Sequence, residues 1–550
     1  MHLCYKLDNK ESVKVVLKNG QNNVVRIVPE PDTRKIDISL ALPIRDMHSY
    51  WTPVRKMSHP AGTLQYHIDF HASATENFPL ISFFSSEMIN RGTVGISDLI
   101  HNVSISAAMN QQARTYDIKL TLCADETISP FCTTVDMREE NWQSVIEQWR
   151  EKLDLTLPEF PPAAWKPVFC SWYVVHADVD SDWIERNAVL AKKYGFGTFI
   201  LDDGWCYDQR RRSNTENAKN WYAPLGDWQV SKDKFPDFAA HIKKVQAIGL
   251  RYMIWVAPFL VGADTDFGRK NPDALHPDSE MCGGARILNT DDADGCDKML
   301  AQIEKIMLDY SPDGLKIDFL DQPTRQIKGT RGRGIWKFVT ELVSRIRAIK
   351  TDALIEFRQD YAVPQMLTLG TQFRAVDCPF DYLINFKRCC QIRLCLGDNV
   401  PVHADPAYWA ENEKPENIAK HLIAMFAGVP MLSVDLEHLN PTEEKIISFY
   451  LSLYRRFTTL MSKGHWIINR GLSDIYSAEV AYGGEKIIIA ADPVQWKTTT
   501  ALAGNKTCLI LNLSSSEIAV DTVESFNPDG SCCSENVIPV GGGGFLRQNN

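Results

Sequence analysis

Between about residue 166 and residue 440, short apolar runs alternate with amphipathic stretches, and this alternation constrains the fold more than any other feature. Strand-length apolar runs separated by helix-length amphipathic segments are typical of βα units in a parallel sheet. Eight such units over about 290 residues match the usual size of a TIM barrel. The eight candidate strands are VFCSWYVV, FGTFILDDG, LRYMIWVAPF, DGLKIDFL, ALIEFRQD, FRAVDCP, VPVHAD and VPMLSVDL.

The segments between these runs have the pattern and the ends of helices. Several close on a glycine, which suits a helix C-terminus; examples are SDWIERNAVLAKKYG, DFAAHIKKVQAIG and NIAKHLIAMFAG. The same alternation allows a doubly wound open sheet, but no G-x-G-x-x-G follows the first strand to support a dinucleotide fold. The sequence therefore favours a closed (β/α)8 barrel.

The periodicity changes at both ends of the chain. The first roughly 135 residues carry short alternating runs such as KIDISLALP and YDIKLTLCAD, which are typical of a β-sandwich. Strand periodicity returns after about residue 460, in runs such as KIIIAAD and TCLILNLS. A chain of 550 residues also exceeds one hydrophobic core. We expect a multidomain α/β protein with an N-terminal β-sandwich (1–140), a catalytic TIM barrel (141–455) and a small C-terminal β-domain (456–550).

Charge and cysteine usage exclude several function classes. The net charge of -10 repels nucleic acid and anionic membrane surfaces, so neither is an expected partner. The most apolar central stretch, 250–262, falls well short of the roughly 20 residues that span a bilayer. The N-terminus lacks the apolar run of a secretory signal, and the 14 cysteines lack zinc-site spacing. These features predict a cytoplasmic protein with reduced thiols.

Polar side chains gather at the ends of the predicted strands, where TIM barrels carry their catalytic groups. A single strand-end Asp is often only the N-cap of the next helix. Several charges brought to one face without mutual pairing would cost several kcal/mol each, so the cluster predicts a polar ligand. The candidates on the second to sixth strands are Asp202, Asp203, Trp205, Trp255, Lys316, Asp318, Arg358, Arg374, Asp377 and Asp381.

These residue types suit cleavage of a glycosidic bond. Retaining cleavage needs two carboxyl groups roughly 5 to 5.5 Å apart, one to attack the anomeric carbon and one to protonate the leaving oxygen. Asp318 and Asp377 can supply the pair. Lys316 points to the same side of its strand as Asp318 and favours the ionised nucleophile, and Arg374 would act similarly on Asp377. We expect the Asp318 charge to raise the pKa of Asp377, because a general acid must keep its proton near neutral pH.

Three tryptophans near the strand ends offer apolar faces to a sugar ring. They are Trp172, Trp205 and Trp255. For any one of them, packing in the core is an equal alternative. The sequence alone leaves this choice open.

Five motifs occur in order on the predicted strands: FCSWY, ILDDGW with LGDWQVSKDKFPDF, GLRYMIWVAPFLVG, LKIDFLD and FRAVDCPFD. Together they resemble those of glycoside hydrolase family 36, the α-galactosidase or melibiase family, and especially its shorter microbial members. The resemblance covers the predicted barrel almost throughout. The family's N-terminal β-supersandwich and C-terminal β-domain agree with the domain organisation expected from the periodicity.

The resemblance implies a retaining, exo-acting hydrolase of terminal α-linked galactose that forms a covalent glycosyl-enzyme without metal or cofactor. Asp318 then corresponds to the nucleophile and Asp377 to the acid/base. The other candidates would bind the substrate, a small oligosaccharide or glycoside, together with Trp172 and Tyr173 of FCSWY. Family members often assemble, which allows a homo-oligomer.

Two departures from the family pattern leave alternatives open. On the fifth strand the family often has a Cys and small residues near the sugar 2-position, whereas this chain has EFRQDY with Arg358. A related α-glycosidase or transglycosylase therefore remains an alternative, such as an α-N-acetylgalactosaminidase, an α-glucosidase or a raffinose-synthase-like enzyme. A non-catalytic carbohydrate-binding barrel is disfavoured by the presence of both carboxylates. Asp381 follows Asp377 by four residues and is the alternative acid/base.

Overall fold

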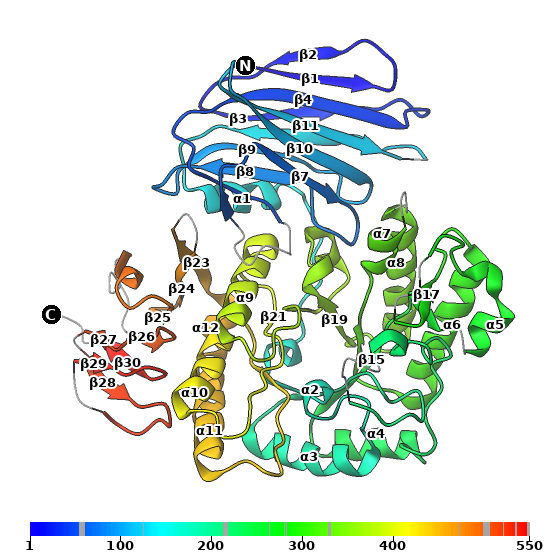
Figure 1. The fold of residues 1–550 in the computed structure, drawn as a ribbon, viewed down its shortest axis with the longest axis vertical. Coiled ribbons are helices and arrows are strands. Elements are labelled where there is room, and N and C mark those ends of the chain that lie inside the picture. The colour runs from blue at the N-terminus through cyan, green and yellow to red at the C-terminus, as the bar shows by residue number, and fades with distance from the viewer. Residues whose placement is uncertain are drawn as a thin grey trace.

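The computed structural model describes residues 1–53, 61–124, 126–212, 218–262, 265–279, 281, 283–327, 332–471, 474–498, 507–520, 522–533 and 536–546. Two antiparallel sheets come first along the chain, a parallel barrel with its helices follows, and a mixed sheet comes last (Figure 1). The predicted fold class, a central barrel with flanking β-domains, is therefore confirmed.

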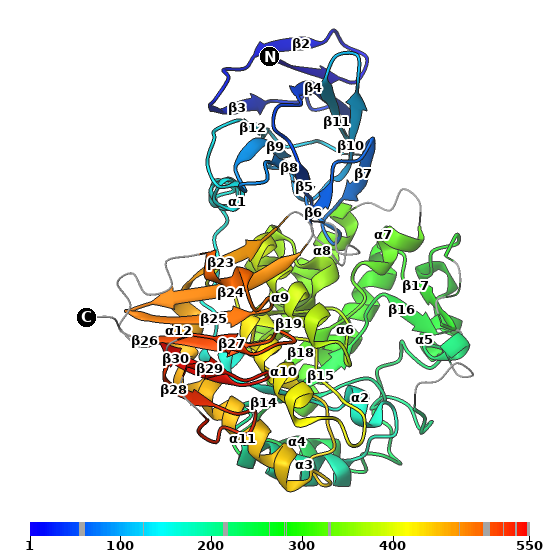
Figure 2. The ribbon, with the colours of Figure 1, turned by 60° about the vertical axis from the view of Figure 1, so that its left-hand side comes forward.

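The two N-terminal sheets form a sandwich above the barrel in the views of Figures 1 and 2. Alternate residues of β11, such as Ile118 and Leu120, are buried between the sheets, as the period of two requires. The first sheet, in spatial order, contains β2 (Val13–Val16), β1 (His2–Leu7), β4 (Lys35–Pro43), β11 (Thr115–Cys123), β10 (Asn102–Asn110) and β7 (His67–Ala72). The second contains β3 (Asn22–Ile27), β12 (Phe131–Asp136), β9 (Asn90–Ile96), β8 (Leu80–Phe84), β5 (Ser49–Trp51) and β6 (Ala61–Thr63).

Eight parallel strands form the barrel, and their hydrogen-bonded order runs from β21 through β20, β19, β18, β15, β14 and β13 to β22. Two parallel bridges, His403 to Val429 and Ala407 to Leu432, join the two outer strands and nearly close the ring. In chain order the strands are β13 (Val168–Cys170), β14 (Thr198–Leu201), β15 (Arg251–Val256), β18 (Gly314–Ile317), β19 (Leu354–Arg358), β20 (Gln372–Arg374), β21 (Val402–His403) and β22 (Met431–Leu432).

Helices cover the outside of the barrel. In α3, Asp180 caps the N-terminus, buried Ile184, Ala188 and Ala191 form the inner face, and Gly195 ends the helix at φ 92, as the sequence predicts. The principal helices are α3 (Ser181–Tyr194), α4 (Phe238–Ala247), α6 (Ala293–Tyr310), α8 (Gly332–Ile349), α9 (Tyr382–Leu396), α10 (Pro415–Ala424), α11 (Pro441–Arg456) and α12 (Thr458–Lys463). Helix α1 (Trp142–Glu151) follows the sandwich, and the short α5 (Asp266–Lys270), α7 (Gln322–Gln326) and hairpin β16 (Leu260–Gly262) to β17 (Ala285–Ile287) lie in barrel loops.

The first barrel strand is shorter than the sequence predicts. Strand β13 ends at Cys170, and the rest of the run VFCSWYVV turns into the short helix α2 (Trp172–Val175). This turn follows the carboxyl end of the strand, so Trp172 and Tyr173 come to the mouth of the barrel rather than into its wall.

The C-terminal sheet packs against the barrel helices, where strand β26 contacts α10 and β24 contacts α12. Its order is β23 (His465–Arg470), β24 (Ile475–Tyr482), β25 (Glu485–Ala490), β26 (Thr507–Asn512), β30 (Gly543–Leu546) and β28 (Thr522–Phe526), with a small pair of β27 (Ile518–Ala519) and β29 (Val537–Ile538) beside it. Among the helices that the structure describes, none has the length and apolarity needed to cross a membrane.

Candidate active site

Asp318 directly follows β18 and is buried. Its Oδ2 accepts a hydrogen bond from Trp255 Nε1 at 3.1 Å, and its Oδ1 accepts one from the N–H of Phe319 at 2.9 Å. Phe319 has φ 58, a left-handed conformation that is uncommon for an aromatic residue. Burial would raise the pKa of Asp318, but the charges of Arg358 and Lys316 outweigh it and hold this pKa below its usual value. Asp318 is therefore ionised, as a nucleophile must be.

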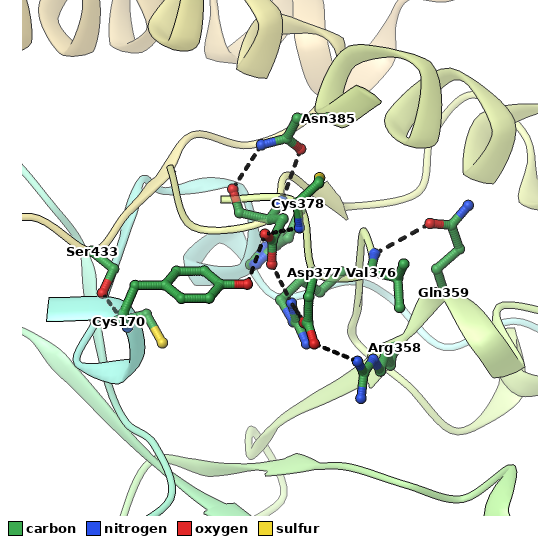
Figure 3. A network of polar contacts seen from close by, with 12 residues as sticks. Cys170, Arg358, Gln359, Val376, Asp377, Cys378, Asn385 and Ser433 are labelled. Atoms are coloured by element: carbon green, nitrogen blue, oxygen red, sulfur yellow. Dashed lines mark hydrogen bonds and ion pairs between the residues drawn. The ribbon is translucent and has the colours of Figure 1, made fainter. Parts of the chain in front are cut away.

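Arg358, the last residue of β19, joins the two predicted catalytic carboxylates. Its Nη1 donates to Asp318 Oδ1 at 3.0 Å, and its Nη2 donates to Asp377 Oδ2 at 2.6 Å. Figure 3 shows the second contact, with the labelled Arg358 and Asp377 reaching toward one another. Asp360 Oδ2 lies 3.4 Å from Nε of the same guanidinium. A cation thus lies against both carboxylates that the proposed chemistry would use.

Asp377 follows β20 and is the more exposed of the two proposed catalytic carboxylates, with 46% of its side chain accessible. Arg374 Nη1 lies 3.1 Å from its Oδ1, on the other side from Arg358. Burial of its surroundings would raise the pKa of Asp377, but the two guanidinium groups outweigh this effect and hold the pKa well below the usual range. The expectation of a raised pKa is therefore wrong for this arrangement, because two cations face the carboxylate directly.

Asp405, beyond the end of β21, belongs to the same network and is missing from the sequence prediction. The fully buried carboxylate accepts hydrogen bonds from Tyr173 Oη at 3.0 Å, the N–H of Cys378 at 2.6 Å and Arg374 Nη1 at 2.5 Å. Burial raises the pKa of Asp405 to about 6, with the charge of Arg374 opposing the rise and that of Asp377 adding to it. Arg374 is therefore shared between a buried carboxylate and an exposed one.

A signal for Asp405 is present in the sequence. It closes VPVHAD, the seventh predicted strand, in the same way that the other candidates close theirs. The motifs of the family resemblance end at the sixth strand, so they do not include Asp405.

The two adjacent carboxylates after β14 point to different partners. Asp202 Oδ2 pairs with Lys316 Nζ at 2.5 Å, which places the predicted lysine against Asp202 as well as beside Asp318. Asp203 instead accepts hydrogen bonds from Trp221 Nε1 at 2.6 Å and Tyr207 Oη at 3.1 Å. Burial raises the pKa of Asp203 to about 6. Asp202 is thus held in an ion pair with a lysine, whereas Asp203 is held by hydrogen bonds from two aromatic side chains.

Two of the three predicted tryptophans lie at the mouth of the barrel. Trp172 is partly buried and meets Trp221 edge to face, with ring centroids 5.7 Å apart. Trp255 is buried beside Asp318, to which its indole N–H donates. Both therefore lie near the strand-end carboxylates, and their role in binding a substrate stays a prediction.

Trp205 does not lie in the site, contrary to the prediction that it binds substrate. Its fully buried ring stacks on Phe238 at 5.8 Å, and its Nε1 donates to the carbonyl oxygen of Trp255 at 2.9 Å. The side chain therefore packs between the strand and α4, which is the core alternative for a tryptophan at a strand end.

Asp381 is also placed differently from the prediction. It is the N-cap of α9, where its Oδ1 accepts a hydrogen bond from the N–H of Ile384 at 2.9 Å, and it is exposed. An N-cap carboxylate is committed to the helix end. This position disfavours Asp381 as the alternative acid/base and as a substrate ligand, because one of its oxygens is held at the helix end.

Comparisons with known proteins place this chain among α-galactosidase-like sequences and folds. The Melibiase family model matches residues 157–332. Alpha-galactosidase Mel36A of Lactobacillus acidophilus is 29% identical over 161 residues, which cover 28% of this chain and 20% of the relative. Alpha-galactosidase AgaA of Geobacillus stearothermophilus is 30% identical over 144 residues, covering 25% of this chain and 18% of the relative. The chain thus aligns with about a fifth of the length of these curated relatives.

The structural likeness extends much further than the sequence identity. A variant of the GH36 alpha-galactosidase AgaA from Geobacillus stearothermophilus in complex with raffinose has a TM-score of 0.65 at 14% identity, covering 99% of this chain and 89% of that chain. The galactosidase domain of the alpha-galactosidase-sucrose kinase AgaSK has a TM-score of 0.65 at 16% identity, and the match covers 97% of this chain and 76% of that chain. At these identities the likeness concerns the fold.

Proposed function

Because the chain belongs to glycoside hydrolase family 36, we propose that it is an exo-acting, retaining α-galactosidase that releases terminal α-linked galactose through a covalent glycosyl-enzyme. The observation that carries the proposal is the pair of carboxylates at the ends of β18 and β20, Asp318 and Asp377, which contact one guanidinium. The relatives named alpha-galactosidases support the substrate class.

In the first half of the proposed reaction, Asp318 attacks the anomeric carbon. Its pKa below the usual value keeps it ionised, and the Trp255 indole N–H orients the carboxylate. Asp377 protonates the glycosidic oxygen as the bond breaks. In the second half, Asp377 accepts a proton from the water that releases the sugar, so that the starting configuration is restored.

Asp377 needs a proton for this role, and the resting arrangement keeps it ionised. A sugar ring that enters between Asp318 and Asp377 would take the place of the Arg358 contacts. Loss of the 2.6 Å contact with Arg358 removes one of the two cations that depress the pKa of Asp377, so the pKa rises when substrate binds. Substrate entry and proton uptake are coupled in this proposal.

Remaining polar groups would hold the sugar hydroxyls. Asp202, paired with Lys316, and Asp203, held by Trp221 and Tyr207, offer carboxylate oxygens at the end of β14. Sugar hydroxyls both donate and accept hydrogen bonds, so the oxygens of these two carboxylates and the ammonium of Lys316 suit them.

Arg358 supports a second candidate, a related α-glycosidase or transglycosylase. It stands at or near the place on the fifth strand where the family resemblance implies Cys and small residues beside the sugar 2-position. A guanidinium there would favour a sugar with a different substituent or stereochemistry at that carbon. The candidates are an α-N-acetylgalactosaminidase, an α-glucosidase and a raffinose-synthase-like enzyme.

We also propose a cytoplasmic location. The cysteines in the described part of the chain are all free, and most of those in the barrel are buried. This usage suits a reducing compartment.

A panel of nitrophenyl α-glycosides tests the activity directly. We expect turnover of the α-galactoside above the α-glucoside and the α-N-acetylgalactosaminide, with α-galactose as the first anomer seen by NMR. Absence of turnover of the α-galactoside would overturn the galactosidase proposal, and first release of β-galactose would overturn the retaining mechanism.

A further inference from the structure

A second carboxylate lies below the arginines of the site, deeper in the barrel. Glu356 is on β19, two residues before Arg358, and its side chain points to the same side of the strand. The side chain is almost fully buried, and its Oε1 lies 3.8 Å from Nε of Arg374, beyond hydrogen-bond distance. Neither of these two buried atoms has a hydrogen-bond partner among the residues that the structure describes. Arg374 therefore faces a carboxylate that its Nε does not reach.

Another nitrogen of the Arg374 guanidinium is shared between two carboxylates. Its Nη1 donates to Asp405 Oδ1 at 2.5 Å and to Asp377 Oδ1 at 3.1 Å. A buried donor and a buried acceptor without partners destabilise a structure, and a short movement of Arg374 onto Glu356 would pair them. The same movement would lengthen the contact between Arg374 and Asp377.

His403, the last residue of β21, holds the other oxygen of Glu356. The charged groups that face Glu356 are His403, Lys316 of β18 and Arg374 of β20. Burial would raise the pKa of Glu356, but the contact with His403 and these charges outweigh it and hold this pKa below its usual value, so Glu356 is ionised. Nδ1 of the fully buried His403 lies 3.1 Å from Glu356 Oε2, and Nε2 lies 2.8 Å from the carbonyl oxygen of Ala164. Both oxygens only accept hydrogen bonds, so both ring nitrogens donate and the ring carries a positive charge.

The acid step of the proposed reaction needs Arg374 to leave Asp377. Asp377 must carry a proton when the glycosidic bond breaks, yet Arg358 and Arg374 together hold its pKa well below the usual range. A sugar ring between the two catalytic carboxylates would displace Arg358, but Arg374 contacts the other oxygen of Asp377. Glu356 offers Arg374 a different anionic partner.

We propose that Glu356 is a positioning residue for the acid step: as substrate binds, Arg374 moves from Asp377 onto Glu356, and Asp377 takes up the proton that it gives to the leaving oxygen. His403 holds Glu356 in place for this role. The proton comes from water, and no other bond changes than the hydrogen bonds of Arg374. The inference rests on the proposed function, because it takes Asp377 as the acid/base.

Two neutralising substitutions should move the basic limb of the pH profile of kcat in opposite directions. The profile is measured on an α-galactosyl oligosaccharide, whose poor leaving group depends on the acid, and the basic limb of kcat reports that acid in the enzyme–substrate complex. Glu356→Gln removes the second anionic partner of Arg374, so the limb should move to lower pH by about one unit. His403→Gln leaves the Glu356 charge to act more fully on Arg374 and should move the limb to higher pH. With both residues replaced, the limb should lie near that of the wild type.

Glu356→Asp separates positioning from charge alone. It keeps the negative charge but withdraws the carboxylate from Arg374 by one methylene, so positioning predicts a limb nearer to that of Glu356→Gln than to that of the wild type. Because it keeps both buried charges, it remains usable if a neutral variant does not fold. Glu479→Gln is the matched control: it makes the same change at a buried glutamate of the C-terminal sheet, which pairs with Lys486, and should leave the limb unmoved. A wild-type limb in Glu356→Asp, or shifts of the same sign in Glu356→Gln and His403→Gln, would overturn the proposal.

A crystal structure with galactose bound tests the movement itself and needs no turnover, because the anomeric hydroxyl takes the place of the leaving oxygen. We expect Arg374 Nε within hydrogen-bond distance of Glu356 Oε1 and Arg374 Nη1 beyond that distance from Asp377. If α-galactosides are hydrolysed but Arg374 stays on Asp377, the proposed function stands and the positioning role fails. If none is hydrolysed but the movement is seen, the proposed function fails and the positioning role stands. Absence of both turnover and galactose binding would overturn both.

Discussion

Arg358 donates to Asp377 over 2.6 Å, so the carboxylate proposed as the proton donor rests against a cation in the unliganded protein. We expect Arg358→Ala to move the basic limb of the pH profile of kcat/KM to higher pH. The reason is that the pKa of Asp377 rises when a cation that depresses it is removed. Arg358→Lys keeps a charge and should give an intermediate limb. An unchanged limb in the alanine variant would show that Arg358 does not control Asp377.

Asp318→Ala should reduce kcat by on the order of 10³-fold or more, because the group that forms the covalent intermediate is lost. Added azide can occupy the vacated space and attack from the nucleophile's face, giving a β-configured glycosyl azide from an α-linked substrate. NMR of the product gives the configuration. Recovery of the α-azide would mean that Asp318 is not the nucleophile.

Asp377→Ala should give the opposite stereochemical result. A nitrophenyl leaving group needs little protonation, so the glycosyl-enzyme still forms and then accumulates, because the general base for water is lost. Azide needs no base and should release the α-configured azide. Asp381→Ala is the matched control and should keep nearly full activity while losing about 1 kcal/mol of stability with the N-cap of α9. Loss of activity in Asp381→Ala instead would return that residue to the acid/base role.

Asp405→Asn should move the basic limb of kcat/KM to lower pH. Arg374 then loses its buried anionic partner at 2.5 Å, and its charge acts more fully on Asp377, whose pKa falls further. We expect kcat/KM to fall more for oligosaccharides than for nitrophenyl substrates. The oligosaccharides have poor leaving groups and so depend on protonation by the acid. Asp405→Glu keeps the negative charge and should return the basic limb of kcat/KM part of the way toward its wild-type pH. A uniform loss at every pH and for both substrates would indicate a packing role alone.

Trp205→Ala should lower the free energy of unfolding by about 3 to 5 kcal/mol, the cost of truncating a buried aromatic ring. Trp172→Ala at the mouth should change stability less and raise KM. Denaturant unfolding and steady-state kinetics on the two variants separate these effects. A raised KM in a stable Trp205→Ala protein would contradict its position in the core.

The sequence predicts the barrel because its signal is repetitive, but it does not predict every element. Helix α9 has no amphipathic pattern that would mark its position in the sequence, since it is buried on most of its surface by α1, α10 and β21 and so lacks a polar face. The first strand is predicted too long because an apolar run does not reveal where the backbone turns, here between Cys170 and Trp172.

For the site, the residue types and their strand ends are predictable, whereas their partners are not. Asp377 and Asp381 look alike in sequence, and only the cap geometry of α9 separates them. Whether the pKa of Asp377 is raised or lowered depends on two arginines that approach it from β19 and β20. The spacing of residues along the chain does not reveal these contacts. Asp405, by contrast, is predictable from the sequence, because it closes the seventh strand run VPVHAD.

The left-handed backbone of Phe319 affects which residues position 319 can accept. A glycine would adopt φ 58 without strain, so backbone conformation alone favours glycine over phenylalanine at this position. The Phe319 ring, however, lies 5.3 Å from the Arg358 guanidinium and 5.2 Å from the Tyr222 ring. At position 319 the backbone conformation therefore favours a glycine, whereas the ring contacts favour an aromatic residue. A lineage that relaxes the loop loses the surface against which Arg358 rests, so we expect positions 319 and 358 to change together.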